Sequence, residues 1–268
     1  MSINHQPILK ILSEKLKYLN YSAKTVSMYT HYVGKFLSQV DKYHQHLAAD
    51  DFQQYLNGFE FTSVSQQNQV ISAIKFFYER VLERKYVKVD FKRPRAERRL
   101  PRVIDRDYLL ERIAGIKNSK HKAIIALAYS VGLRVSEVIN LKIIDIDSAR
   151  MVISIRQGKG KRDRIVPLSP NVLTLLRNYY KEYKPLDYLF NGQDSPQYSA
   201  TSCNNIVKQY LGSEYHFHLL RHSCFTSLME DGTDLRIIQK MAGHRSSQTT
   251  EVYTHVSTRV LSRVSLPI

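Results

Sequence analysis

Residues 150–169, RMVISIRQGKGKRDRIVPLS, are where the residue pattern changes from a helical period to a period of two. Two short runs rich in β-branched residues flank a basic turn that contains two glycines, which is the pattern of a β-hairpin. On both sides of this stretch the apolar residues recur at helical spacing. The sequence therefore predicts a mainly α-helical chain with one small β-hairpin in its second half.

Residues 1–84 show the helical pattern that is typical of a small bundle. One helix begins after Ser22, a good N-cap residue, and places Val26 and Val33 on one apolar stripe. A second long helix begins near Ser65. Both are predicted to belong to an N-terminal four-helix domain whose apolar stripes face one another.

Residues 85–103 form a basic stretch without an apolar period, and they are predicted to be a linker. Between Lys85 and Arg102 there are eight basic residues, two acidic residues and two prolines. Such a charge run is usually only solvated, but a basic connector could equally cross a phosphate backbone. The candidate DNA contacts in this linker and in the hairpin turn are Lys92, Arg93, Arg95, Arg98, Arg99, Arg102, Lys161 and Arg162.

Residues 104–268 are predicted to form a second, α+β domain. An apolar helix stops at Gly132, in a C-cap position, and another begins at Ser169 with Pro170 at its first helical position. From about Ala200 onward the pattern is helical to the end of the chain, with breaks at glycines.

The charge balance of the chain favours a polyanion as partner. Of its 268 residues, 40 are Lys or Arg and 24 are Asp or Glu, which gives a formal net charge of +16. Nucleic acid is the first candidate and an anionic membrane surface a distant second. No window approaches about 18 uninterrupted apolar residues, and no signal peptide or myristoylation site is visible, so we expect no membrane partner. Two cysteines are too few for a disulfide scaffold, which indicates a reducing cytoplasm.

Candidate reactive side chains lie at structurally marked places of the second domain: after a helix-ending glycine, in the hairpin turn, on a helix face, and near the C-terminus. Taken singly, each has an ordinary interpretation as a surface charge, a solvated turn lysine, a core histidine beside a salt-bridging arginine, or a packed tyrosine. The set consists of Arg134, Lys159, His218, Arg221, His244 and Tyr253.

Taken together, these side chains indicate chemistry on a phosphodiester. Guanidinium groups offer planar forks for the oxygens of a phosphate, histidines can donate to the same oxygens or move a proton, and a lysine can protonate a leaving alkoxide. A tyrosine hydroxyl has a pKa of about 10, a handicap of roughly 4 kcal/mol for a nucleophile at pH 7 that nearby cations must offset.

Metal-dependent alternatives have weaker support in the sequence. His218 and His222 share a helix face as half of a zinc site would, but the helical zinc motif needs a glutamate where Leu219 stands, and Arg221 would lie beside the metal. A two-metal mechanism needs clustered carboxylates, which the neighbouring acids do not supply at a defensible spacing. We therefore expect neither a metal nor a cofactor.

Four stretches, GLRVSEVINL, GKGKRDRIVPL, HLLRHSCFTSLMEDG and MAGHRSSQTTEVYTH, resemble the motifs of the tyrosine recombinase, or phage integrase, family in their order and spacing. The resemblance runs from about Tyr21, where the sequence is similar to the family's core-binding domain, to about His255. It implies a catalytic domain whose reactive set is the one named above, with Tyr253 attacking a DNA phosphate to give a 3′-phosphotyrosine and a free 5′-hydroxyl. Glu137, one turn after Arg134, is expected to anchor that arginine.

The resemblance also implies partners and a place of action. We expect no additional arm-binding domain and a compact segment between the hairpin and the HLLRH motif, which favours a simple, Xer-like recombinase. We expect it to act in the cytoplasm, on nucleoid DNA, at duplex core sites, as a homotetramer or a tetramer with a paralogue, while a need for accessory proteins stays open. The alternatives are a DNA-binding regulator with the same fold and a type IB topoisomerase-like relaxase.

Overall fold

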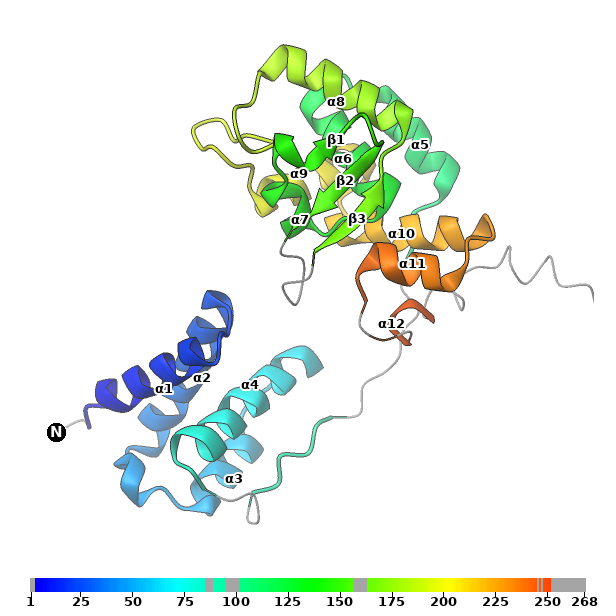
Figure 1. The fold of residues 1–268 in the computed structure, drawn as a ribbon. Coiled ribbons are helices and arrows are strands. Elements are labelled where there is room, and N and C mark those ends of the chain that lie inside the picture. The colour runs from blue at the N-terminus through cyan, green and yellow to red at the C-terminus, as the bar shows by residue number, and fades with distance from the viewer. Residues whose placement is uncertain are drawn as a thin grey trace, which may run out of the picture. The chain divides into compact units, whose positions relative to one another are not determined.

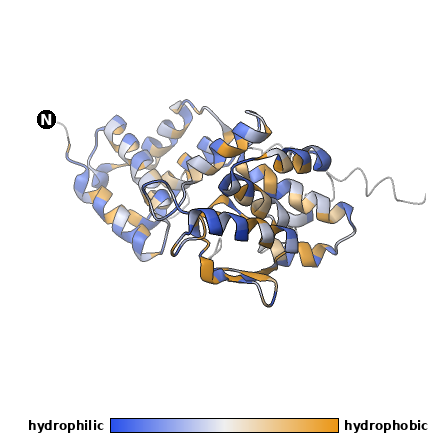
Figure 2. Cartoon of the chain, turned by 90° about the horizontal axis from the view of Figure 1, so that it is seen from above, coloured by the Kyte–Doolittle hydropathy of each residue, from blue (hydrophilic) through white to orange (hydrophobic). Residues whose placement is uncertain are grey.

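The computed structural model describes residues 3–84, 89–94, 102–156, 163–244, 246 and 248–251. The chain divides into two compact units, Met1–Arg98 and Arg99–Ile268. Within the described ranges, no helix combines the length and apolarity that a membrane span requires. Most helices of both units carry hydrophilic and hydrophobic residues together, as amphipathic helices do (Figure 2).

The first unit is built from helices, as the sequence predicts (Figure 1). Two short turns of other helix types join or extend the four main ones. The elements are α1 (Gln6–Tyr18), α2 (Ala23–Val40), the 3₁₀-helix η1 (His44–His46), α3 (Ala49–Gly58), α4 (Val64–Phe76) and the π-helix η2 (Phe77–Val81).

Aromatic rings fill the core of the first unit. The ring centroid of Phe36 on α2 lies 4.6 Å from that of Phe52 on α3 and 6.4 Å from that of Phe77. Val26 and Val33, on the predicted stripe of α2, are buried in the same core. The predicted bundle of four helices with facing apolar stripes is therefore confirmed.

Part of the expected linker packs against this core instead of being solvated. Val89 and Phe91 are buried in the first unit, while Asp90 and Lys92 between and after them are exposed. The backbone N–H of Asp90 donates to Gln53 Oε1 at 2.8 Å. The alternation of apolar and charged residues here gives an extended segment one apolar face, a period of two that a search for helical spacing overlooks.

The second unit places a small sheet among helices. Its elements are α5 (Arg106–Gly115), α6 (Ser119–Val131), α7 (Val135–Asn140), the 3₁₀-helix η4 (Ile143–Asp145), β1 (Ile146–Asp147), β2 (Val152–Ile155), β3 (Arg164–Pro167), α8 (Pro170–Tyr183), α9 (Ala200–Leu211), α10 (Phe217–Glu230), α11 (Leu235–Ala242) and α12 (Gln248–Glu251).

The sheet is antiparallel in the order β1-β2-β3. Ile153 pairs with Val166 across the β2–β3 hairpin, and both side chains are buried. The predicted hairpin is confirmed. Strand β1 was not predicted, because a strand of two residues is too short to show an alternating pattern.

Local capping signals set the helix ends that were predicted. Ser22 Oγ accepts a hydrogen bond from the backbone N–H of Thr25, and Ser169 Oγ accepts one from that of Val172. Gly132 ends α6 in the left-handed conformation, at φ 65° and ψ 42°.

Helix α6 organises the second unit. Ile124, Leu127 and Ala128 are fully buried, and the helix packs against both α8 and α10 (Figure 1). Because α6 stops at Gly132, the chain turns sharply before α7, and Arg134 lies at the junction of these two helices.

Replacing Gly132 with alanine should destabilise the second unit by about 2 kcal/mol or more, because the left-handed backbone disfavours a Cβ and the added atom would lie 2.4 Å from the Phe225 ring. Gly115→Ala is the matched control, since an added Cβ there meets nothing within 4 Å and the backbone is not left-handed. We expect it to be neutral or stabilising by about 0.5 kcal/mol. Urea denaturation measures the free energy of unfolding of both variants. Equal changes in the two would contradict the need for glycine at position 132.

Candidate active site

The turn after α6 presents the first candidate residue. Arg134 takes the extended N-cap position of α7, at φ −73° and ψ 151°. Its backbone N–H donates to Glu137 Oε2 at 2.9 Å, and its Nη1 donates to Glu137 Oε1 at 2.7 Å. One carboxylate thus satisfies the orphan N–H at the helix start and holds the arginine side chain beside it.

Glu137 is buried between two arginines. Arg164, at the start of β3, donates from Nη1 to Oε1 at 2.9 Å and from Nη2 to Oε2 at 2.8 Å, a bidentate fork. Burial alone would raise the pKa of Glu137, but the hydrogen bonds and charge of Arg164, followed by those of Arg134, hold that pKa at about 2. The carboxylate is therefore ionised at any physiological pH.

Arg221 on α10 is almost completely buried, at 1% exposure. Its Nη1 donates to the backbone carbonyl of Gly132 at 2.5 Å, and its Nη2 donates to that of Ala242 at 2.6 Å. The same Ala242 carbonyl accepts Arg134 Nη2 at 3.2 Å. Two guanidinium groups that are far apart in sequence thus donate to one carbonyl oxygen atom.

His244 follows α11 and lies against Arg221, with Nε2 at 3.0 Å from Arg221 Nη2. An arginine can only donate, so Nε2 is the acceptor and the ring proton is on Nδ1, which donates to Thr250 Oγ1 at 3.0 Å. Burial first, and then the charges of Arg221 and Arg134, lower the pKa of His244 to about 4. The imidazole is therefore neutral at neutral pH.

His218 lies in the first turn of α10 and is exposed. Its ring is edge-on to that of His222, with centroids 4.6 Å apart. Burial, followed by the charge of His218, lowers the pKa of His222 to about 4. Across the parts of the chain that the structure describes, no group of three His, Cys, Asp or Glu side chains is arranged to hold a metal ion.

The electrostatics of this cluster favour an anion. The cluster holds three guanidinium groups, those of Arg134, Arg164 and Arg221, and one carboxylate, that of Glu137, which pairs with Arg134 and Arg164. The side chain of Arg134 keeps 16% exposure. An excess of fixed positive charge in a partly buried site attracts a phosphate and keeps its interactions strong, because solvent screens them little.

Several predicted site residues lie outside the described residues. They are Lys159 and Tyr253 of the reactive set, and Arg95, Arg98, Arg99, Lys161 and Arg162 of the candidate DNA contacts. Of the described candidates, Lys92 and Arg102 are exposed, and Arg93 donates to Asn68 Oδ1 and Ser72 Oγ of the first unit.

Two residues of the cluster, Arg164 and Thr250, were not predicted from the sequence. Arg164 reads as the polar first residue of a strand, and Thr250 as an ordinary helical threonine. A signal for Arg164 is present, because it stands two residues before Val166, so that both lie on one face of the strand, and Val166 is buried. A charged residue on the buried face of a strand needs a partner.

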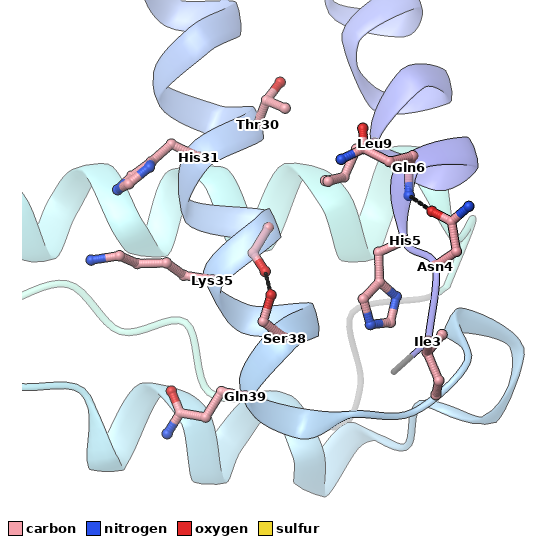
Figure 3. A pocket seen from close by; sticks show the side chains of 11 residues that line it. Ile3, Asn4, His5, Gln6, Leu9, Thr30, His31, Lys35, Ser38 and Gln39 are labelled. Atoms are coloured by element: carbon pink, nitrogen blue, oxygen red, sulfur yellow. Dashed lines mark hydrogen bonds between the residues drawn. The ribbon is translucent and has the colours of Figure 1, made fainter. Parts of the chain in front are cut away.

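A shallow groove in the first unit offers no comparable chemistry. It lies between the start of α1 and the second half of α2 and is lined by residues 3–6, 9, 30, 31, 34, 35, 38 and 39 (Figure 3). The side chains of His31 and Lys35 point away from the segment that carries His5 (Figure 3). These polar groups do not converge on a common point.

Comparisons with known proteins assign both units. The family model described as "Phage integrase family" matches residues 106–259, and "Phage integrase, N-terminal SAM-like domain" matches residues 8–88. A putative integrase/recombinase of Sinorhizobium fredii is 32% identical, covering 97% of this chain and 88% of the relative. Tyrosine recombinase XerA of Pyrococcus horikoshii is 34% identical, covering 94% of this chain and 90% of the relative.

Solved structures agree with this assignment. A crystal structure of XerA recombinase is 27% identical, with a TM-score of 0.56, and the match covers 98% of this chain and 100% of that one. XerH site-specific recombinase bound to palindromic difH has a TM-score of 0.71 at 20% identity, covering 97% of this chain and 88% of that one, which shows a likeness of fold.

Lowering the pH from 7 toward 4 should reduce the free energy of unfolding of the second unit. The unfolded chain protonates its histidines near a pKa of about 6.5, whereas burial lowers the pKa of His222 and of His244 to about 4 in the folded chain. Each contributes at most about 1.4 kcal/mol per pH unit, and less where solvent reaches the ring.

Urea denaturation between pH 4 and pH 7.5 measures this slope, and His244→Asn should flatten it. An unchanged slope in the variant would contradict the lowered pKa of His244. NMR of the imidazole nitrogens gives an independent check, with the Nδ1–H tautomer expected at pH 7.

Proposed function

Because the chain belongs to the phage integrase family and is a site-specific DNA recombinase, we propose that Tyr253 cuts one strand of a DNA duplex and becomes joined to its 3′ phosphate. The observation that carries this proposal is the meeting of Arg134 and Arg221 at the carbonyl of Ala242, with His244 against Arg221. A guanidinium has five N–H donors, and among the described residues that of Arg134 donates from Nη1 to Glu137 and from Nη2 to Ala242.

In the proposed reaction, the Tyr253 oxygen forms a bond to phosphorus while the bond from phosphorus to the 5′ oxygen breaks. Arg134 and Arg221 hold the non-bridging oxygens, whose charge grows in the transition state. Lys159 gives a proton to the departing 5′ oxygen, and the exposed imidazole of His218 receives the phenol proton. The phosphotyrosyl bond retains the free energy of the diester, so rejoining to another strand needs no ATP.

Recombination requires two duplex sites to be held together. We propose that four protomers, all of this chain or shared with a paralogue, bind two core sites, and that the first unit and the basic residues Arg98, Arg99 and Arg102 contact the DNA backbone. The excess of basic residues in the chain supports this assignment. Two structures of similar fold are DNA complexes, those of XerH with difH and of the Tn1549 transposon integrase with transposon right end DNA.

The proposed setting is the cytoplasm, with nucleoid DNA as the substrate. Cys203 and Cys224 are free thiols and both are buried, which agrees with a reducing compartment. Integration, excision, inversion and dimer resolution all use the chemistry proposed here, and the arrangement of the two sites chooses between them.

Tyr253→Phe should abolish the covalent protein–DNA adduct and keep DNA binding, because it removes one oxygen atom and little volume. A nicked duplex that traps the adduct, followed by denaturing electrophoresis, is the assay, with a gel shift as the binding control. An adduct of undiminished yield would refute the nucleophile. Strand exchange between two labelled duplexes separates a recombinase from a monomeric relaxase, which makes no recombinants.

Lys159→Ala should slow cleavage of a normal duplex by about 10²- to 10⁴-fold, the usual contribution of a general acid. A duplex with sulfur in place of the bridging 5′ oxygen should restore the rate, because a thiolate leaves without a proton. Single-turnover cleavage of both substrates measures this. Equal losses on both would mean that Lys159 only positions the DNA.

A further inference from the structure

We propose that Arg164 is a positioning residue of the recombination reaction, which fixes both the carboxylate that holds Arg134 and the backbone that leads to His244. This inference rests on the proposed function, in which Arg134 holds the phosphate together with Arg221, the arginine that His244 contacts. Arg164 lies 27 residues after Glu137 in sequence and on a different element.

The first step of the argument is the geometry around Glu137. Each carboxylate oxygen accepts one N–H from Arg164 and one from Arg134, at 2.7 to 2.9 Å. The side chains of Arg164 and Glu137 are 9% and 3% exposed. The carboxylate therefore accepts four charge-assisted or helix-capping hydrogen bonds, which fix its orientation. Because Arg134 donates to this carboxylate, its side chain is held in place as well.

The second step is the contact of Arg164 with the end of α11. Its Nε donates to the carbonyl of Met241 at 2.7 Å. The next carbonyl, that of Ala242, is the one that Arg134 and Arg221 share. Arg164 thus fixes the helix end whose last carbonyl orients both phosphate-holding arginines.

The third step is the path of the chain beyond α11. Gly243 has a left-handed backbone at φ 62°, and a Cβ built on it would lie 3.3 Å from Arg164 Cδ. The chain therefore passes closely over the Arg164 side chain just before His244. The glycine permits this close approach and the turn that follows it.

Arg164 does not itself bind the phosphate in this arrangement. Its Nε, Nη1 and Nη2 each donate to an acceptor within the protein, and its side chain is nearly buried. Its influence on the reaction therefore passes through Glu137 and through α11.

Arg164→Met should lower the single-turnover cleavage rate at pH 7 on the order of 100-fold, because a small displacement of phosphate-holding groups has effects of that size. Binding of the duplex in a gel shift should stay within about twofold of wild type. Arg164→Lys keeps the charge but loses the fork, so we expect a smaller loss, on the order of tenfold.

The pH profile separates positioning from general damage. The charged groups that contact Glu137 are Arg134, at the N-cap of α7, and Arg164 on β3. Beyond them lie Arg221 on α10 and His244 after α11. Without Arg164, burial raises the pKa of Glu137, so cleavage by Arg164→Met should fall between pH 7 and pH 5.5 more steeply than cleavage by wild type. Arg164→Lys should keep the wild-type profile.

A double-mutant cycle with Glu137→Gln tests whether Arg164 acts on the reaction through Glu137. If Arg164 acts through Glu137, the double variant should lose less than the product of the two single losses. The double variant also removes the unpaired buried charge, which guards against a fold lost for that reason alone. Circular dichroism confirms folding of each variant.

Arg106→Met is the matched control, because Arg106 makes an equally short ion pair with Asp231, at 2.8 Å, away from the cluster. It should cleave at the wild-type rate. If the wild-type protein forms no adduct, the proposed function itself is refuted. The role of Arg164 is overturned if folded Arg164→Met keeps the wild-type cleavage rate and pH profile. It is also overturned if the losses of the two single variants multiply in the double variant.

Discussion

The ionised, buried carboxylate of Glu137 is the constraint on which the candidate active site depends. Taking a carboxylate out of water costs several kcal/mol, and the four hydrogen bonds from Arg134 and Arg164 offset that cost. This single negative charge pairs with two guanidinium groups, and Arg221 adds a third at the carbonyl that Arg134 also contacts, so the cluster stays positive. The site can therefore be ordered by the protein alone and still attract a phosphate.

Helix ends supply the other half of this arrangement. Gly132 and Gly243 both end a helix in the left-handed conformation, at φ 65° and 62°. The carbonyl groups at a helix C-terminus lack partners within the helix and carry its partial negative charge. Arg221 donates to one such carbonyl at the end of α6 and to another at the end of α11. The arginines that are proposed to hold DNA therefore also cap helices, which ties the site to the packing of the domain.

The state of His244 follows from the same contacts. Arg221 makes Nε2 an acceptor and Thr250 fixes the proton on Nδ1, so the imidazole is neutral. A bound phosphate would bring a negative charge that opposes the effect of the arginines on its pKa. This difference gives DNA binding a direct effect on the protonation of His244, which contacts Arg221, one of the arginines proposed to hold the phosphate.

The sequence by itself determined the features that short-range physics controls. These features depend on residues that lie close together in the chain, so a sequence pattern can predict them. They are the caps at Ser22 and Ser169, the left-handed end of α6 at Gly132 and the hairpin. The motifs that resemble a known family also singled out the reactive set, of which Arg134, Arg221 and His244 are seen to meet.

Only the tertiary structure decided which partner each of these groups takes. Arg164 meets Glu137 across 27 positions of sequence, and Arg134 meets the carbonyl of Ala242 across 108. The burial of Val89 against the first unit likewise depends on surfaces that other helices provide. A guanidinium can pair with any carboxylate or carbonyl within reach, so its presence in the sequence does not predict its partner. The packing of elements that are distant in sequence determines that partner.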